Sequence, residues 1–321
     1  MAIASVATQP RLYSNVDARA RPFLKWAGGK RQLLPQLRRY IPETFSTYFE
    51  PFVGSGALFF DLANNRSVHE YRAVLTDINR DLVGCYRAIA TDVEAVISEL
   101  GNHAGRHSRR QQAYYYEIRD DLFNPTRREL FNRSGPEEIE YPACLAAMFI
   151  YLNRTGFNGL YRLNSRGDFN VPAGRYANPQ ICDADNLRAV SRILASDGVE
   201  VRCRAFDVVL EDARRGDLVY FDPPYAPMSA TSSFTSYTAD GFSSQDQEQL
   251  REVAIELADR GCHVIVSNST AALITSLYRN SAVKRAGLRA HRVAARRAIN
   301  CDATRRGDIS EYILTNVPAS N

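Results

Sequence analysis

The stretch that decides the fold is YFEPFVGSGALFFDLA at residues 48–63, followed by the apolar run AVLTD at residues 73–77. Residues 48–53 predict a short buried strand, and the glycines of GSG at 54–56 predict a turn that leads into an apolar helix. The second run predicts another strand, which ends on the carboxylate of Asp77. A strand, a helix and a strand in this order favour a parallel sheet and an α/β fold.

Similar elements follow along the chain. Asn79 is a suitable N-cap for a helix that we expect to run on toward Leu100. Residues 101–142 interrupt the pattern because they are polar and rich in Arg, and the Gly- and Asn-rich segment 152–162 predicts a loop and hairpin. Other predicted elements are helical pieces at 114–122 and 143–152, strands at 199–205, 217–222, 263–267 and 311–316, and a helix at 245–259.

The chain has 321 residues, 45% of them hydrophobic, which suits one large domain, or a domain with an insert, rather than a disordered protein. We expect residues 1–20 to form a flexible tail. Residues 21–79 and 183–321 would form the α/β domain, with residues 80–182 inserted into it.

The charge distribution and the cysteine content indicate which kinds of binding site to expect. The net charge is only +4, but eight Lys or Arg residues and one acid lie between Lys284 and Arg306. Such a stretch is either a solvated face or a site for an anion such as nucleic acid. The six cysteines form no C-x-x-C pair, which favours buried thiols in a reducing compartment over a metal or disulfide framework.

Two further classes of site are not expected. His103 and His107 could share a helix face, but no third ligand is evident, so we predict no metal site. The apolar run at residues 2–7 is too short for a signal peptide, and no stretch approaches the length of a membrane span.

The strongest chemical signal is Asp222-Pro223-Pro224-Tyr225 at the end of a predicted apolar strand. Ligands of open α/β sheets collect beyond the carboxyl ends of the strands. There, the Asp222 carboxylate and the Pro223 carbonyl could accept the two N–H bonds of an exocyclic amine and stabilise the charge that develops as it is alkylated. Tyr225 offers a face for stacking an extruded base. The alternative is an Asp-Pro turn after a strand.

A second signal is the turn with Gly54 and Gly56, which allows a ligand close to the backbone. Asp77, at the end of the next strand, is placed to hold ribose hydroxyls. Alone this pattern would suit a dinucleotide equally well, but the third glycine of that fingerprint is absent because residue 59 is Phe.

A third signal is FLKWAGGK at residues 23–30. It lacks the spacing of a nucleoside-triphosphate loop, because Leu24 and Arg31 occupy the positions that need Gly and Ser or Thr. Trp26 could line a cofactor pocket in which Lys30 meets a carboxylate. Otherwise the segment is a connection with a packed Trp.

Together these segments resemble the Dam-type DNA adenine methyltransferases. The matching motifs are FLKWAGGK (23–30), EPFVGSG (50–56), LTDIN (75–79), LNRTGFNGL (152–160), GDFNVPAGRY (167–176) and DPPYAPMSAT (222–231). They occur in the family's order over residues 21–317. The resemblance implies a Rossmann-like methyltransferase fold, S-adenosyl-L-methionine as cofactor, and transfer of its methyl group to adenine N6 in double-stranded DNA by base flipping.

The resemblance also implies roles for individual residues. Motif and resemblance together give the catalytic set Asp222, Pro223, Pro224 and Tyr225, and the cofactor contacts Trp26, Lys30, Glu50, Phe52, Gly54, Gly56, Asp77 and Asp222. Residues 80–182 become a largely helical DNA target-recognition insert with a hairpin. Its implied DNA contacts, with one from the N-terminal motif, are Lys25, Phe157, Asn158, Leu160, Arg162, Pro172, Arg175 and Tyr176.

Within this set, Phe157 would stack where the base leaves the duplex, and Arg175 and Tyr176 would hold phosphate. Arg162 would read a base edge, in keeping with the bidentate pairing of Arg and guanine. The family suggests GATC or a close relative as the target.

The sequence departs from the family in three places: the tail before Arg21, a longer segment at 124–140, and the residues Thr155, Tyr161 and Ala173 in the segment 152–176, which we call the reading block. These departures bear on the target sequence more than on the reaction.

Two other functions stay open at this point. One is a DNA-binding protein without catalysis, against which the intact 222–225 motif argues. The other is methylation of RNA adenine or of a glutamine side chain, against which the block at 152–176 argues. We expect a monomer in the cytoplasm, at the nucleoid of a bacterium or a phage-infected cell, and the sequence leaves restriction–modification and replication marking as open roles.

Overall fold

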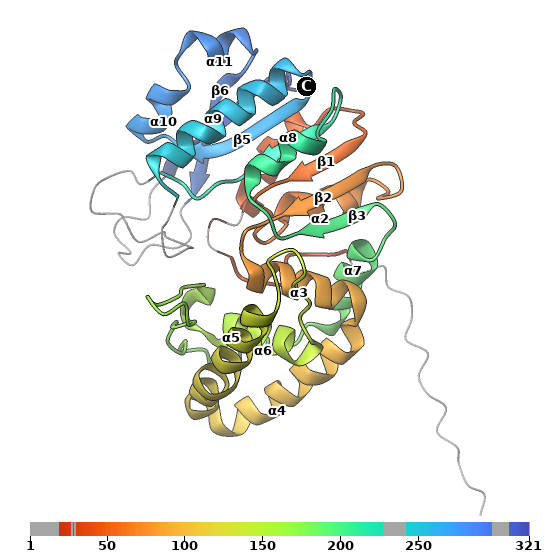
Figure 1. Ribbon diagram of the computed structural model, residues 1–321, viewed down its shortest axis with the longest axis vertical. Coiled ribbons are helices and arrows are strands. Elements are labelled where there is room, and N and C mark those ends of the chain that lie inside the picture. Colours follow the sequence, from red (N-terminus) through yellow and green to blue (C-terminus); the bar gives the residue numbers. More distant parts are fainter. Residues whose placement is uncertain (1–18, 27, 29, 227–241, 297–307, 321) are drawn as a thin grey trace, which may run out of the picture.

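A computed structural model describes residues 19–26, 28, 30–226, 242–296 and 308–320, and its centre is a seven-stranded sheet (Figure 1). The strand order is β3-β2-β1-β4-β5-β7-β6. The strands are β1 (Thr47–Glu50), β2 (Arg72–Thr76), β3 (Val199–Arg202), β4 (Leu218–Phe221), β5 (His263–Ser269), β6 (Arg289–Arg296) and β7 (Asp308–Thr315). β1 to β5 run parallel, whereas β7 is antiparallel to both β5 and β6. The predicted α/β fold with a mostly parallel sheet is confirmed.

Both faces of the sheet are buried because successive strand residues point to opposite sides. Tyr48 and Phe49 of β1 belong to different apolar clusters, and so do Tyr220 and Val219 of β4. Helix α9 (Ser244–Asp259) covers one face, and α2 (Ala57–Asn65), α3 (Arg80–Thr91) and α7 (Ala184–Leu194) lie on the other. Because helices cover both faces of the sheet, the strands are short continuous apolar runs.

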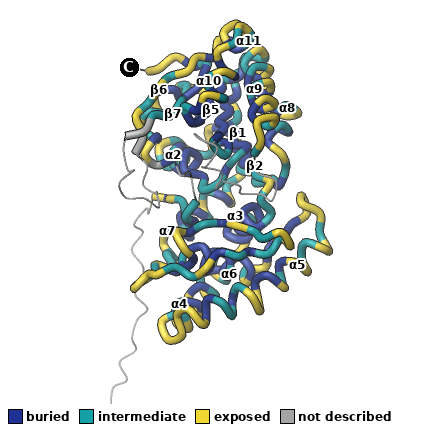
Figure 2. Tube along the Cα trace, turned by 90° about the vertical axis from the view of Figure 1, so that its left-hand side faces the viewer, coloured by how far each residue is buried: buried dark blue, intermediate teal, exposed yellow. Residues whose placement is uncertain are grey.

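A group of helices forms a second body beside the sheet. It contains α4 (Val93–Tyr116), a π-helical stretch (Glu117–Phe123), α5 (Asn124–Arg133) and α6 (Ala143–Thr155). Helices α3 and α7 lie between this group and the sheet (Figures 1 and 2). The short helices are α1 (Leu34–Leu37), α8 (Val209–Asp212), α10 (Ala272–Leu277) and α11 (Ser281–Arg285).

One expectation about secondary structure was wrong. The helix that begins at Asn79 ends at Thr91 and does not continue to Leu100, because Asp92 leaves the helical conformation and its carboxylate caps the next helix at Ala95 N (3.2 Å). Asn79 itself is the N-cap as predicted, since its side chain accepts from Leu82 N at 3.1 Å.

The basic stretch, for which a solvated face or an anion site was expected, includes strand β6 (Arg289–Arg296). β6 lies at the edge of the sheet and pairs with β7. Charged side chains suit an edge strand because they discourage pairing with other chains. This part of the stretch therefore has a structural role that its charge did not suggest.

His103 and His107 do share a helix face, but both rings hydrogen-bond to tyrosines. His103 Nδ1 lies 2.8 Å from Tyr114 Oη, and His107 Nδ1 lies 2.9 Å from Tyr151 Oη. Burial lowers the pKa of His103 to about 4. In the part of the chain that the structure describes, no cluster of His, Cys, Asp and Glu is suited to a metal ion. Over those same residues, no helix has the length and apolar character of a membrane span.

Candidate active site and nucleic-acid interface

Three acidic residues lie close together at the carboxyl ends of the parallel strands. Glu50 ends β1, Asp77 follows β2 and Asp222 follows β4. β1 pairs in parallel with both β2 and β4, so the carboxyl ends of the three strands lie side by side. This is the edge at which open α/β sheets bind ligands.

The Asp222 carboxylate is held by two donors on the same oxygen. Lys30 Nζ and Ser267 Oγ each lie 2.8 Å from Asp222 Oδ1. Among the residues that the structure describes, Asp222 Oδ2 and the Pro223 carbonyl have no hydrogen-bond partner. Burial raises the pKa of Asp222, and Lys30 and Ser267 counteract this rise. The carboxylate is thus fixed through one oxygen and has the other available for a ligand.

The rest of the motif is also fixed. Tyr225 Oη donates to Glu311 Oε2 at 2.8 Å, and Lys30 Nζ lies 4.2 Å from the centre of the Tyr225 ring. Gln247 Nε2 donates to the Pro224 carbonyl at 3.0 Å, and the buried Asn268 donates in turn to Gln247 Oε1 at 2.9 Å. The backbone of the motif is therefore anchored on α9 and on the polar end of β5.

The glycine turn after β1 adopts the backbone that its residues allow. Gly54 and Gly56 have φ of 46° and 65°, in the left-handed region that favours glycine. A Cβ at Gly54 would lie 3.0 Å from the Trp26 ring, and one at Gly56 would lie 2.8 Å from Tyr86 Oη. The turn thus packs tightly between two aromatic side chains.

Asp77 closes this turn. Its Oδ2 accepts from Gly54 N at 3.2 Å and its Oδ1 accepts from Asn79 N at 3.0 Å. Burial raises the pKa of Asp77 to about 6, although these hydrogen bonds lower it. The neighbouring Ile78 is 55% exposed, so an apolar side chain borders the carboxylate.

Glu50 and Phe52 are more enclosed. Glu50 is 2% exposed and accepts from Tyr48 Oη at 2.8 Å, and burial raises the pKa of Glu50 well above its usual range. The Phe52 ring stacks on Phe206 with 5.2 Å between ring centres. Phe52 therefore contributes to packing under the turn, and its expected cofactor contact stays a prediction.

The structure brings Lys25 from the N-terminal motif to the reading block. Asn153 accepts from Lys25 N and donates to Lys25 O, both at 2.8 Å, and also donates to Gly159 O at 3.1 Å. Lys25 Nζ lies 4.0 Å from the centre of the Tyr176 ring. A buried asparagine thus ties together two segments that are far apart in the sequence.

The predicted DNA contacts form an exposed group. Phe157 is 45% and Tyr176 37% exposed, two of the few exposed large hydrophobic residues among those described. Phe157 N donates to Pro172 O at 2.9 Å, which places the two ends of the block side by side. Asn158, Arg162, Pro172 and Arg175 are exposed, and Leu160 is half-buried.

Arg162 is the most clearly oriented of these side chains. Its Nε donates to Asn170 Oδ1 at 2.7 Å and its Nη2 to Asn170 O at 3.2 Å. Within the described part of the chain, Nη1 has no partner. One edge of the guanidinium is therefore occupied, and its end faces outward.

Several residues around the site were missed by the sequence analysis. They are Ser267, Gln247, Asn268, Tyr86 and Ile78, which hold the motif or line the turn. Polar residues within the otherwise apolar strand at 263–269 were the available signal for Ser267 and Asn268, because a buried polar side chain needs a partner.

Comparison with known proteins shows which family the whole chain resembles. The family profile described as D12 class N6 adenine-specific DNA methyltransferase matches residues 26–299. The chain is 40% identical over 296 residues to the type II methyltransferase M1.LlaDCHI of Lactococcus lactis subsp. cremoris, covering 92% of this chain and 95% of the relative.

Two further relatives match over similar lengths. The type II methyltransferase M.MjaIII of Methanocaldococcus jannaschii is 39% identical, with 92% of this chain and 99% of the relative covered. The DNA adenine methylase of Escherichia coli strain K12 is 32% identical, with 93% and 96% covered.

Proposed function

Because the chain belongs to the family of D12 class N6 adenine-specific DNA methyltransferases, we propose that Asp222 and Pro223 hold the target adenine for methyl transfer. The enzyme is an adenine-specific DNA methyltransferase that uses S-adenosylmethionine. The residue roles, the base-flipping step and the target sequence are the proposal.

One observation carries it: Asp222 is fixed through Oδ1 alone. With Lys30 and Ser267 on that oxygen, Oδ2 would accept one N–H of the adenine amine, and the Pro223 carbonyl would accept the other. The amine lone pair is delocalised into the ring, so two acceptors that favour a tetrahedral nitrogen raise its nucleophilicity. They also stabilise the positive charge that develops on nitrogen.

The turn at Gly54–Gly56 has the chemistry to hold the cofactor. The Trp26 ring and exposed Ile78 offer apolar contact, and Asp77 offers a carboxylate for ribose hydroxyls. When bound, S-adenosylmethionine supplies an electrophilic methyl group on a sulfonium. Lys30, which contacts both Asp222 and the Tyr225 ring, joins this pocket to the adenine site.

The target base would leave the duplex to reach this site. Enzymes that act on a base extrude it, and an exposed aromatic ring can fill the space left in the stack. Phe157 has the exposure for that role, and Tyr225 has a ring beside the catalytic carboxylate. Lys25 would reach a guanine, and Arg175 and Tyr176 would hold phosphate groups of the DNA.

Sequence choice would depend on Arg162, whose outward guanidinium end suits the two major-groove acceptors of guanine. The expected target is GATC or a close relative. We further propose that residues 80–182 form the DNA-recognition part of the chain and that the enzyme acts as a monomer.

The test is identification of the methylated product. The protein would be incubated with methyl-labelled cofactor and, in separate reactions, GATC duplexes, duplexes with one altered base pair, RNA and protein, and the nucleic acids would be digested to nucleosides. We expect label in N6-methyl-2′-deoxyadenosine from the GATC duplex, incorporated at a rate lower by about 100-fold or more with Asp222→Ala. Label on cytosine, RNA or protein would contradict the assignment.

A further inference from the structure

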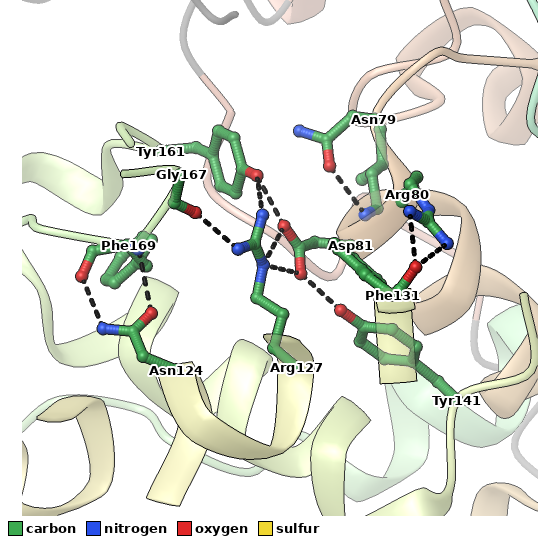
Figure 3. Close-up of polar contacts among 11 residues, drawn as sticks. Asn79, Arg80, Asp81, Asn124, Arg127, Phe131, Tyr141, Tyr161, Gly167 and Phe169 are labelled. Carbon is green, nitrogen blue, oxygen red and sulfur yellow. Dashed lines mark hydrogen bonds and ion pairs between the residues drawn. The ribbon is translucent and has the colours of Figure 1, made fainter. Parts of the chain in front are cut away.

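A buried carboxylate joins the reading block to the rest of the molecule. Asp81, at the start of α3, is fully buried, and Arg127 of α5 donates from Nε to both its oxygens at 2.7 and 2.8 Å. The hydroxyls of Tyr141 and Tyr161 also donate to this carboxylate (Figure 3). Each donor comes from a different segment, so three segments meet at one side chain of α3.

Helix α5 also hydrogen-bonds directly to the backbone of residues 156–173, whose two arms pair through antiparallel bridges and which we call the reading hairpin. Arg127 Nη1 donates to Gly167 O at 2.6 Å. One turn earlier, Asn124 donates to Phe169 O at 3.0 Å and accepts from Phe169 N at 2.9 Å. Because Asn124 and Arg127 are three residues apart on one helix, their side chains share a face and together fix residues 167–169.

The segment fixed by α5 leads directly to the residue that orients Arg162. Asn170 follows Phe169 directly, and its side chain and carbonyl hold the Arg162 guanidinium. Asn170 N in turn donates to Arg162 O at 3.1 Å. A shift of Phe169 would therefore move the partner that sets the direction of Arg162.

The same cluster reaches the cofactor turn. The Tyr161 ring stacks on Trp26 with 5.7 Å between centres, and Trp26 packs against Gly54. A further contact joins α3 and α5, because the guanidinium of Arg80 in α3 lies 4.0 Å from the ring centre of Phe131 in α5. The reading hairpin is thus fixed on both sides, by α5 and by the N-terminal motif.

Asn124 and Arg127 of α5 and Tyr161 of the reading block meet in this cluster. A buried charge without its partners is costly, whereas a fully hydrogen-bonded one fixes the elements that it joins. All members here are 7% exposed or less.

We propose that Asn124, Arg127 and Tyr161 are positioning residues for sequence discrimination, which act by fixing the hairpin so that Arg162 meets its base pair. This inference rests on the proposed base-reading role of Arg162. It assigns to the 124–140 segment a role in target choice, through contacts with the hairpin and not with DNA.

A matched pair of variants separates positioning from simple stability. Tyr161→Phe and Tyr141→Phe each remove one hydroxyl that donates to Asp81, but only Tyr161 belongs to the reading block. Asn124→Ala removes the two hydrogen bonds to Phe169, and Arg162→Ala serves as the reference for lost base reading. Should Asn124→Ala fail to fold, the tyrosine pair still gives the answer.

The measurements are kcat/KM on a GATC duplex and on a duplex altered at one base pair, the dissociation constant of S-adenosylmethionine, and the melting temperature. The specificity ratio is kcat/KM on the GATC duplex divided by kcat/KM on the altered duplex. We expect Asn124→Ala and Tyr161→Phe to lower this ratio by about 3- to 10-fold, the effect expected for the loss of a hydrogen bond. Cofactor affinity should stay unchanged. Tyr141→Phe should lower the melting temperature and leave the ratio intact.

Two outcomes would overturn the inference in distinguishable ways. If both tyrosine variants and Asn124→Ala keep the ratio while Arg162→Ala lowers it, the cluster has only a structural role. If Arg162→Ala itself keeps the ratio, the base-reading role in the proposed function fails, and this inference fails with it.

Discussion

The ammonium group of Lys30 lies 2.8 Å from Asp222 Oδ1 and 4.2 Å from the centre of the Tyr225 ring. Lys30 is 7% exposed and also donates to Gly28 O at 2.7 Å. Lys30, from the FLKWAGGK segment, thus counteracts the rise in the pKa of Asp222 that burial causes.

Lys30→Met should move the acidic limb of the pH–rate profile to higher pH. Burial raises the pKa of Asp222 and Lys30 lowers it, so without Lys30 the pKa rises further and less of the carboxylate is ionised at neutral pH. Single-turnover methylation rates measured across pH would show the shift. Lys30→Arg, which keeps the charge, is the control, and an unshifted limb in Lys30→Met would contradict the role.

Asp222→Ala should lower the rate of methyl transfer by about 100-fold or more, the scale of removing a group that stabilises a transition state. Ser267→Ala removes one hydrogen bond that orients the carboxylate, and should cost about 2- to 10-fold. Single-turnover rates at saturating DNA and cofactor would measure both. Equal losses in the two variants would show that Ser267 does more than orient Asp222.

Cofactor affinity should rise with pH through the titration of Asp77. Its pKa in the folded protein is raised to about 6, so the carboxyl becomes largely protonated as the pH falls below that value. We expect S-adenosylmethionine to bind about tenfold more weakly at about pH 5 than at about pH 7, measured by calorimetry. Asp77→Asn should bind weakly at both values, and the same pH dependence in that variant would exclude Asp77 as its source.

The same shift affects stability with the opposite sign. A carboxyl whose pKa is raised on folding stabilises the folded state most below its unfolded pKa, and this contribution is lost as the pH rises through about 6. As the pH rises from about 4 to about 6, the free energy of unfolding of the cofactor-free enzyme should therefore fall relative to that of Asp77→Asn. Thermal unfolding of both proteins across pH checks the difference.

Arg175→Ala should weaken binding to all duplexes alike and reduce the salt dependence of binding, because a phosphate contact releases counterions. Arg162→Ala should instead cost about 1–3 kcal/mol at one base pair. Binding titrations on a duplex series at several salt concentrations separate the two effects. A uniform loss in both variants would leave Arg162 without a base-reading role.

Local sequence patterns predicted the elements that carry the motifs. A strand within 48–53 (β1, which ends at Glu50), the turn at Gly54–Gly56 and the strand before Asp222 were found because apolar runs that end in Gly or Asp have few other solutions. Their meeting at one edge followed from the parallel order. The family resemblance, confirmed by the profile match, then supplied the reaction.

Features that depend on distant partners could not be predicted in this way. Nothing near Asp81 shows that Arg127, Tyr141 and Tyr161 will surround it, and nothing near Asp222 shows that Ser267 will bond to Oδ1. The edge strand β6 was missed because its Arg residues mask the alternation of a strand. The break at Asp92 was missed because one capping carboxylate outweighs a continuous helical pattern.

A crystal structure of the enzyme with S-adenosylhomocysteine and a duplex that carries the target adenine would test the central claim most directly. We expect the flipped adenine to place its N6 within about 2.6–3.2 Å of both Asp222 Oδ2 and the Pro223 carbonyl, with Lys30 still on Oδ1. An adenine amine held by other acceptors, with Asp222 Oδ2 turned away from it, would show that Asp222 and Pro223 do not bind the target base.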